Sequence, residues 1–195
     1  MDAGGNTSNI VTRTVNVTDQ TPPVVTVLGS SPLTVAHGSV YVDSGATWTD
    51  NVDGTGMAAI ISGSVDTATL GTYILIYRHT DTGGNISTVA TRTVHVTDQT
   101  APVVALVGTS SITIPHGVDY IDSGATWTDA IDGTGTATLI SGSVNTGVVG
   151  TYTLTYRHTD TAGNTGNTVT RTIIVTDQTP PAVTLSGSAT GTVAQ

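Results

Sequence analysis

The 195-residue sequence contains no cysteine, lysine, glutamate or phenylalanine, and only 10% of its residues are charged. Without cysteine, the chain forms neither a disulfide framework nor a thiolate zinc site. Without lysine, it has no Schiff-base lysine, no P-loop lysine and no lysine crosslink. Lysine and glutamate are also good helix formers, so their absence argues against a helical protein.

The charge is one-sided, because all 14 acidic residues are aspartate and the five basic residues are arginine, giving a formal net charge of −9. Nucleic acid requires a basic face, so nucleic-acid binding is excluded. The sequence has no run of about 18 apolar residues, and we expect no membrane insertion. Met1 is followed by DAGGN, which is not the basic and then apolar start of a secretory signal.

An internal repeat of 79 residues organises the sequence. TDQTPP begins at Thr18, TDQTAP at Thr97 and TDQTPP again at Thr176, and 48 of 79 positions are identical between the two full copies. We therefore predict two complete repeats, 18–96 and 97–175. Residues 1–17 correspond to the C-terminal part of a preceding repeat and 176–195 to the N-terminal part of a following one. This pattern is typical of a window from a longer tandem array.

Each copy is rich in threonine, valine, isoleucine and tyrosine, which favour strands. Short β-branched runs alternate with glycine and Asp-Gly turn signals about every ten residues. In the first copy the expected strands are 24–28, 33–35, 40–50 with a bulge at Ser44-Gly45, 58–62, 73–78 and the segment after Arg92. We predict an all-β fold of tandem immunoglobulin-like antiparallel sandwiches, with about seven strands each.

A Gly-Thr-Tyr sequence precedes one strand of each copy. Tyr73 and Tyr152 fit the tyrosine corner at the start of strand F in immunoglobulin-like sandwiches. On that topology the loop 81–85 is the F–G loop and 50–56 the B–C loop. Both then lie at the end of the domain where the chain enters strand A, together with the TDQT segment.

The motif series TD-x-T-x-P, HG-x-x-Y-x-DSGAT-x-TD-x-x-DGTG, GTY-x-L-x-Y-x-x-TDT-x-GN and TRT-x-x-V resembles a family of bacterial immunoglobulin-like repeats. The resemblance implies tandem modules of large secreted and cell-surface proteins, including adhesins, extracellular enzymes and insecticidal crystal toxins. It covers both full copies and departs from the family at Trp48 and Trp127, where we expect a small residue. It implies an extracellular location, on a bacterial cell surface or secreted, and calcium at the repeat junctions.

Aspartates and one asparagine of each copy should meet at this end of the domain. Several carboxylates repel one another unless a cation lies among them, and calcium takes 6–8 oxygen ligands. The sequence therefore predicts one calcium ion (Ca2+) at the head of each repeat. Its candidate ligands are Asp19, Asp50, Asp53, Asp81 and Asn85 in the first copy, and Asp98, Asp129, Asp132, Asp160 and Asn164 in the second.

A second interpretation of the same residues stays open. Asp-x-x-Gly-Asn forms a hairpin loop without any ion, because aspartate caps its own turn and glycine and asparagine tolerate the left-handed region. Asp43 and Asp122 precede Ser-Gly and are interpreted as bulge or turn partners. Arg92 and Arg171 are expected to make surface ion pairs with the loop carboxylates.

The aromatic residues also have two interpretations. Trp48 and Trp127 either fill cores that contain no phenylalanine or stack on sugars. His79 and His158 are either solvated strand-end residues or metal ligands and pH sensors. The threonine pairs suggest ice binding only if they form a flat array, and we expect them to be scattered among strands.

Catalysis has no support, because the sequence lacks a nucleophile elbow and a thin sandwich holds no deep cleft. The sequence thus predicts a non-catalytic spacer, in which short Pro-containing linkers join the repeats into a stiff rod of roughly 70–80 Å for two repeats. The alternative is an adhesive module that binds a cell-surface glycan or protein. For the spacer, the partners are the neighbouring repeats of the same chain. The two end segments are expected to pair with a sheet edge or end to end with another chain.

Overall fold

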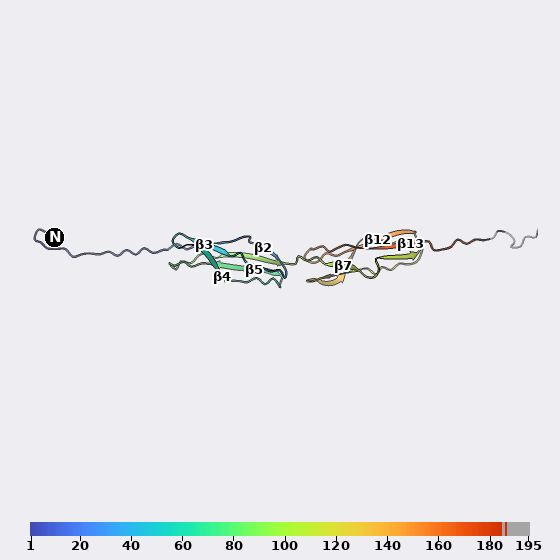
Figure 1. Ribbon diagram of the computed structural model, residues 1–195, viewed down its shortest axis with the longest axis horizontal. Helices are drawn as coiled ribbons and strands as arrows, with labels where there is room; N and C mark the ends of the chain where they lie inside the picture. Colours follow the sequence, from blue (N-terminus) through green and yellow to red (C-terminus); the bar gives the residue numbers. More distant parts are fainter. Residues whose placement is uncertain (185, 187–195) are drawn as a thin grey trace, which may run out of the picture. The chain divides into compact units, whose positions relative to one another are not determined.

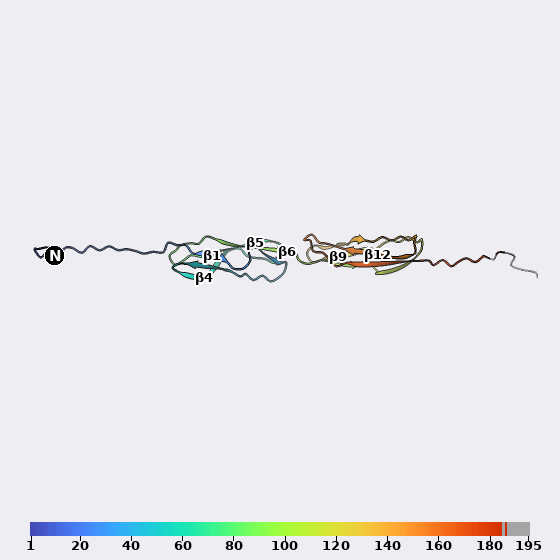
Figure 2. The ribbon, with the colours of Figure 1, turned by 90° about the horizontal axis from the view of Figure 1, so that it is seen from above.

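A computed structural model describes residues 1–184 and 186. Within that part every regular element is a strand, and no helix is long and apolar enough to cross a membrane. The chain divides into two compact units, Met1–Asp98 and Gln99–Gln195. The predicted all-β immunoglobulin-like fold is confirmed, and Figures 1 and 2 show strands running along the length of each unit.

The first unit contains six strands: β1 (Val24–Val27), β2 (Leu33–Ala36), β3 (Ala46–Asp50), β4 (Gly54–Ser62), β5 (Gly71–Arg78) and β6 (Ala90–Thr97). Their order in the sheet is β1-β3-β4-β5-β6-β2. The first half of β4 pairs with β3 and its second half with β5, so β4 joins the two layers of the sandwich. All neighbours are antiparallel except β2 and β6, which are parallel.

The second unit repeats this arrangement with seven strands: β7 (Val103–Leu106), β8 (Ser111–Pro115), β9 (Ala125–Asp129), β10 (Gly133–Thr136), β11 (Thr138–Ser141), β12 (Gly150–Arg157) and β13 (Val169–Thr176). The strand corresponding to β4 is divided into β10 and β11. The two sheets are therefore separate, with orders β10-β9-β7 and β11-β12-β13-β8. The parallel pair is again the second strand with the last, β8 with β13.

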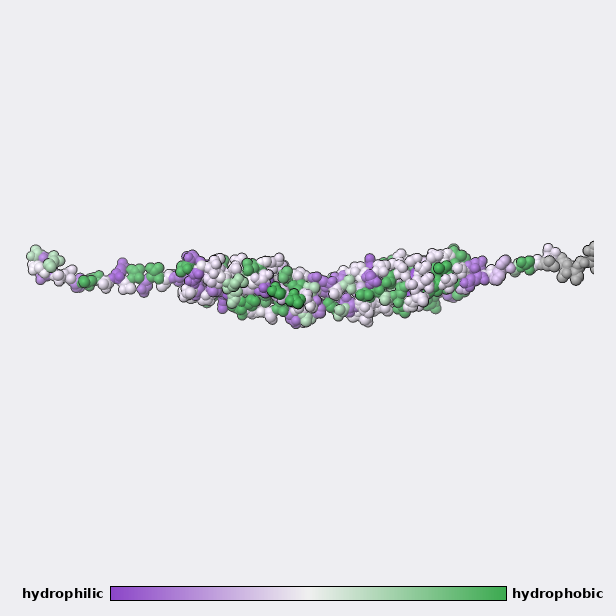
Figure 3. All heavy atoms as spheres, viewed as in Figure 1, coloured by the Kyte–Doolittle hydropathy of each residue, from purple (hydrophilic) through white to green (hydrophobic). Residues whose placement is uncertain are grey.

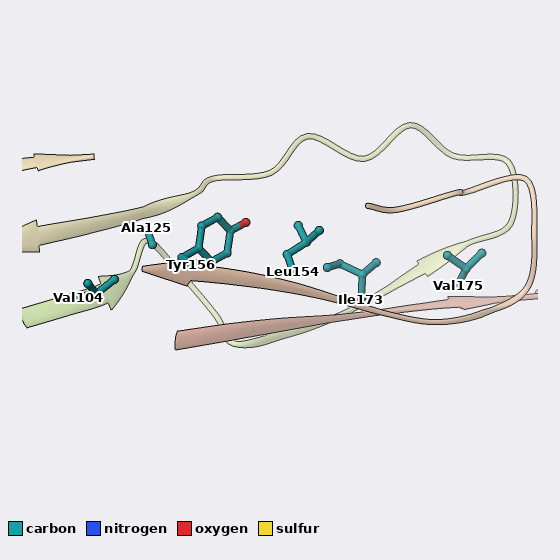
Figure 4. Close-up of a cluster of buried hydrophobic side chains, with 6 residues drawn as sticks. All are labelled: Val104, Ala125, Leu154, Tyr156, Ile173 and Val175. Carbon is teal, nitrogen blue, oxygen red and sulfur yellow. The ribbon is translucent and has the colours of Figure 1, made fainter. Parts of the chain in front are cut away.

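Both cores consist of side chains that alternate along the strands. Leu75, Tyr77 and Val94 are buried in the first unit, together with Ala46. Figure 4 shows the corresponding cluster of the second unit, with Leu154 and Tyr156 of β12 facing inward. The outer faces mix apolar and polar side chains, as Figure 3 shows for the visible side. A repeat of 79 residues buries a limited apolar surface, so buried polar contacts have a large share in its stability.

The tyrosine corner predicted for each copy is confirmed. The Tyr73 hydroxyl donates to the Thr69 carbonyl at 2.8 Å, and the Tyr152 hydroxyl donates to the Val148 carbonyl at 2.9 Å. These bonds fasten the loop before β5 and β12 to the strand that follows it.

The expected strand over residues 40–50 was partly wrong, because the ladder begins only at Ala46. Gly45 has a φ of 77°, and the Asp43 carboxylate accepts the Gly45 N–H at 3.1 Å. The chain therefore turns before β3, and the exposed Val40 and Val42 lie outside the sheet. The expected strand is thereby shortened to β3, and the first unit has six strands where about seven were expected.

Among the residues that the structure describes, the end segments do not pair with a sheet edge of this chain. Residues 6–23 form no strand, and Ile10 and Val17 are more than 90% exposed. An isolated strand has no partner for its backbone hydrogen bonds and does not form a ladder alone. Pairing with another chain stays a prediction. Of the segment 176–195, Thr176 ends β13 and residues 177–184 and 186 are without strand; the remainder lies outside the described residues.

Candidate functional site

Three aspartates from distant parts of the first unit meet at one end of its sandwich. Asp19 precedes β1, Asp50 ends β3 and Asp81 follows β5. Each offers a carboxylate oxygen, and these oxygens all lie within 4.8 Å of one another. At this separation and an effective dielectric constant of about 20, each pair of charges repels by about 3 kcal/mol. The fold thus holds three negative charges together, an arrangement that a cation would stabilise.

Two oxygens of this triad are buried and have no hydrogen-bond partner, namely Oδ2 of Asp19 and Oδ2 of Asp50. The other oxygen of each residue caps a turn. Oδ1 of Asp19 accepts the Thr21 N–H at 3.0 Å, and Oδ1 of Asp50 accepts the N–H groups of Val52 and Asp53 at 2.7 and 3.0 Å. Buried anionic oxygens without a donor are costly. The turns therefore orient one oxygen of each carboxylate and leave the other available for a ligand.

Asp81 lies in the loop that sequence analysis interpreted either as a hairpin turn or as a source of calcium ligands. Oδ1 of Asp81 accepts the Asn85 N–H at 2.7 Å, and Oδ2 accepts the Asn85 side-chain amide at 2.9 Å. The same amide nitrogen donates to the Asp19 carbonyl at 3.3 Å. Asn85 therefore joins the loop to the segment before β1. The turn geometry is present, and it is compatible with a cation because a carboxylate oxygen accepts more than one contact.

Asp53 lies outside the triad, although it was predicted as a candidate ligand. Its carboxylate accepts the Thr82 N–H at 2.6 Å and the Thr82 hydroxyl at 2.8 Å. These two hydrogen bonds, the backbone one first, lower the pKa of Asp53 below its ordinary value. Asp53 therefore connects the two loops that carry Asp50 and Asp81, and holds them in register.

The corresponding positions of the second copy make the same contacts. Asp98, Asp129 and Asp160 offer oxygens within 4.8 Å of one another. Oδ1 of Asp129 accepts the N–H groups of Ile131 and Asp132, as Asp50 does in the first copy. The remaining candidates again support the loops: Asp132 accepts two hydrogen bonds from Thr161, and Asn164 donates to Asp160.

The pKa of Asp160 reflects two opposing effects. Burial raises this pKa, but the hydrogen bonds from Asn164, Gly163 and Ala162 together lower it by more. The pKa of Asp160 therefore lies below its ordinary value. Asp160 is 8% exposed and thus holds its negative charge in a largely desolvated position.

A stacked aromatic pair lies beside the triad in each unit. Trp48, two residues before Asp50, stacks on His79 with ring centroids 4.0 Å apart and an angle of 6°. A Cβ atom on Gly56 would lie 2.8–2.9 Å from the indole, so the tryptophan packs closely against β4. Trp127 and His158 repeat the stack at 4.1 Å and 4°. Both tryptophans pack against the cores, which supports the core interpretation over a sugar platform.

A polar network around Arg92 was missed by the sequence analysis. Arg92 is 1% exposed, and its Nε lies 2.8 Å from Oδ1 of Asp43. Its guanidinium also donates to the carbonyls of Leu28, Ser30 and Gly45. The expected surface pair with a loop carboxylate was therefore wrong. Arg92 alternates with Val94 and Val96 along β6, and this period-two pattern is the signal that could have placed it inside.

Two tyrosine hydroxyls complete the network by donating to Asp43, that of Tyr41 at 3.0 Å and that of Tyr77 at 2.8 Å. Burial, and then the hydrogen bond to this carboxylate, raises the pKa of Tyr41 to about 12. Arg171, Asp122, Tyr120 and Tyr156 form the equivalent network in the second unit. Asp43 and Asp122 also cap the turn before β3 and β9, which confirms the turn alternative of their interpretation as bulge or turn partners.

The second unit also has a shallow hollow of about 300 Å³ beside β12. It is lined by Thr138, Ile140, Arg157, His158 and Thr159. Arg157 is exposed, and its guanidinium makes no hydrogen bond or ion pair with any described residue. One face of the His158 ring is covered by Trp127, so its edge or opposite face borders the hollow.

Comparison with known proteins identifies the type of domain. Residues 25–96 and 104–175 each match the family model described as bacterial surface protein, Ig-like domain. Hyalin of Strongylocentrotus purpuratus is 38% identical over 195 residues, covering 93% of this chain. An uncharacterized 81.3 kDa protein of Acholeplasma phage L2 is 38% identical over 114 residues, covering 54%. The chain spans only 16% and 15% of the length of these two relatives.

Two solved structures share a distant likeness. The lipoprotein BT2262 from Bacteroides thetaiotaomicron has a TM-score of 0.35 and 24% identity, covering 41% of this chain and 40% of that chain. The M60 catalytic domain with two CBM51 domains of Clostridium perfringens ZmpB has a TM-score of 0.39 and 13% identity, covering 80% of this chain and 31% of that chain.

Proposed function

Because the chain belongs to the family of Ig-like domains of bacterial surface proteins, we propose that it is a calcium-stabilised spacer segment of such a protein. Domains of this family are generally non-catalytic and lie at the cell surface or outside the cell. The spacer holds another part of the surface protein away from the envelope. Calcium at the head of each repeat stiffens the array, in which neighbouring repeats are the partners.

The observation that carries the calcium proposal is the pair of buried, unpartnered oxygens on Asp19 and Asp50. Calcium prefers carboxylate oxygens and takes six to eight ligands, so the three carboxylates supply one oxygen each and water the remainder. Asp19, Asp50 and Asp81 would hold the ion in the first copy, and Asp98, Asp129 and Asp160 in the second. When bound, the ion would offset two of the three negative charges and join the segment before β1 to two loops.

Thermal unfolding of the whole chain tests this proposal, with calcium chloride against EDTA at low ionic strength. A ligand at 100 times its Kd adds about 2.7 kcal/mol. For a domain of this size the midpoint then rises by roughly 11–22 °C. An unchanged midpoint in the wild-type chain contradicts the proposal.

The sharpest variant is Asp50→Asn, because the asparagine carbonyl still caps the turn through Val52 and Asp53 but the charge is lost. We expect the unfolding transition of the first repeat to lose its calcium-dependent rise in midpoint, while the transition of the second repeat keeps it. The matched control is Asp66→Asn, since Asp66 lies in an exposed turn and the second copy has Asn145 there. Terbium luminescence sensitised by Trp48, two residues from Asp50, reports occupancy independently of stability.

A second candidate function, adhesion to a glycan, is favoured by the hollow beside Arg157. Its volume of about 300 Å³ is at the small end of ligand sites and suits one sugar unit. The guanidinium fork matches a sugar carboxylate, and Thr138 and Thr159 provide hydroxyls.

Glucuronic acid, with glucose as the neutral control, tests this candidate by NMR titration of the full chain. Thr138→Ala gives the second copy the alanine that the first copy has at Ala59, and Arg157→Gln removes the guanidinium. Both variants should weaken binding, whereas Arg78→Gln in the first copy should not. Equal binding of glucuronic acid and glucose by all variants contradicts the assignment.

A further inference from the structure

In the layer formed by β4, β5, β6 and β2, the strands that come first and last along the chain, β2 and β6, lie side by side and point the same way. β2 pairs with β6 in parallel, with Leu33 opposite Val94 and Ala36 opposite Thr97. β8 and β13 pair identically, with Ser111 opposite Thr172 and Pro115 opposite Thr176. The chain enters each repeat through β1 or β7, which comes directly before the first member of this pair, and it leaves the repeat directly after the second member.

We propose that each repeat is built to resist tension applied along the chain, and that the parallel pair is the element that resists it. This inference rests on the proposed spacer function and adds a mechanical role to it. Tension that reaches β2 through β1 pulls β2 toward its N-terminus, and tension on the following segment pulls β6 toward its C-terminus. Because the strands are parallel, these pulls are opposed along one axis, so all hydrogen bonds between them are loaded together in shear.

The other end strand is placed for the same loading. β1 begins at Val24, beside Thr49 at the end of β3, whereas β6 ends at the opposite end of the unit. The two points where tension enters therefore lie at opposite ends of the sandwich. No pair of strands is opened one hydrogen bond at a time, as happens when two neighbouring antiparallel strands are pulled from the same end.

Additional contacts fasten β6 to the segment between β1 and β2. The buried Arg92 donates to the carbonyls of Leu28 and Ser30 from the middle of β6. The Ser31 hydroxyl accepts the Thr93 N–H at 3.1 Å. In the second unit Arg171 donates to the carbonyls of Val107 and Thr109 in the same way. Shear along β2 and β6 has to break these contacts as well as the ladder.

The backbone shows which N–H groups of β2 bond to β6. The His37 N–H donates to the Thr97 carbonyl at 2.9 Å, so the N–H of Val35, two residues earlier, faces the same side. The N–H of Ala36 faces away. The second unit agrees, because it has Pro115, which lacks an N–H, at the position of Ala36. Proline is therefore tolerated at one position of this strand and disruptive at the next.

Constant-force spectroscopy of the full chain, in calcium, tests the role of the parallel pair. Val35→Pro removes one hydrogen bond between β2 and β6, whereas Ala36→Pro copies the native residue of the second unit. We expect Val35→Pro to raise the unfolding rate of the first repeat at a given force by at least about fivefold. Ala36→Pro should leave that rate unchanged. Equal rates for the two variants overturn the proposal.

A second measurement separates mechanical direction from stability without altering the ladder. Because the chain has no native cysteine, handles attach only where cysteine is introduced. Gln20→Cys with Gln99→Cys pulls the first repeat along the chain, and Leu70→Cys with Gln99→Cys pulls β5 and β6 apart from one end. All three side chains are exposed.

We expect a clearly higher unfolding force in the first geometry, although the free energy of unfolding is nearly the same for both. Equal forces in the two geometries show that the repeat has no directional resistance, and the tension proposal fails. The calcium-dependent melting shift is measured without force, so its loss would instead count against the spacer's calcium site. The two failures are therefore distinguishable.

Discussion

Replacing Asp43 by asparagine should destabilise the first repeat far more than an ordinary surface change. Oδ1 of Asp43 accepts hydrogen bonds from Tyr41 and Arg92, and Oδ2 accepts them from Tyr77 and Gly45. All four partners are donors. The asparagine amide group, itself a donor, must therefore face one of these pairs whichever way it is oriented.

The magnitude follows from burial. Arg92 is 1% exposed and Asp43 18%, so the variant leaves a guanidinium without its counter-ion inside the protein. Removing one partner of a buried ion pair costs about 3–5 kcal/mol. Small domains have a total stability of about 5–15 kcal/mol. At 3 kcal/mol, the midpoint of a domain of this size falls by roughly 12–24 °C.

Thermal unfolding monitored by Trp48 fluorescence measures this effect, in a chain whose second tryptophan is removed by Trp127→Phe. Asp66→Asn is the control, because Asp66 is exposed and accepts two hydrogen bonds without a cation. It should change the free energy of unfolding by no more than about 0.5 kcal/mol. If Asp43→Asn behaves like this control, the network does not stabilise the repeat and the reasoning is refuted.

Two further predictions concern pH and packing. Burial raises the pKa of Asp122, but hydrogen bonds from two tyrosines and Arg171 together lower it by more. The pKa in the folded protein therefore lies below the unfolded pKa of about 3.9. The contribution of Asp122 to the stability of the second repeat is present above that pH and is lost as the pH falls through the folded pKa. Circular dichroism melts should show the midpoint of the second repeat falling below about pH 4. An unchanged midpoint down to pH 2 contradicts this prediction. Gly56→Ala places a Cβ atom against Trp48 and should separate it from His79, at a cost of about 1–3 kcal/mol. Trp48 emission unaltered from that of the native chain would show that the stack is retained.

Much of the fold was predictable because it depends on local sequence patterns. The 79-residue repeat and the Gly-Thr-Tyr corner predicted the sandwich, and the structure confirms both the strands and the tyrosine bonds. The absence of a strand before Ala46 was not predictable, because residues 40–44 have the same β-branched composition as segments that do form strands. The chain turns there instead, where Asp43 accepts the Gly45 N–H and pairs with Arg92, which is 49 residues away in the sequence.

The candidate site was predictable as a group of residues but not in its division of roles. Topology places Asp19, Asp50 and Asp81 together, as the loop positions indicated. Asp53 is only three residues from Asp50, yet it bonds to Thr82 and lies outside the triad. Nothing in the sequence distinguishes these two aspartates, because the difference depends on which loop each carboxylate meets.

By itself, the sequence determined the repeat length, the β class, the excess of negative charge and the end of the domain where carboxylates gather. These properties follow from composition, periodicity and turn chemistry, which act over a few residues. Only the tertiary structure decided that Arg92 is buried with Asp43, that Trp48 stacks on His79 and that the strand beside β6 runs parallel to it. Each of these depends on contacts between segments more than 30 residues apart, and such contacts form only when the whole sandwich closes.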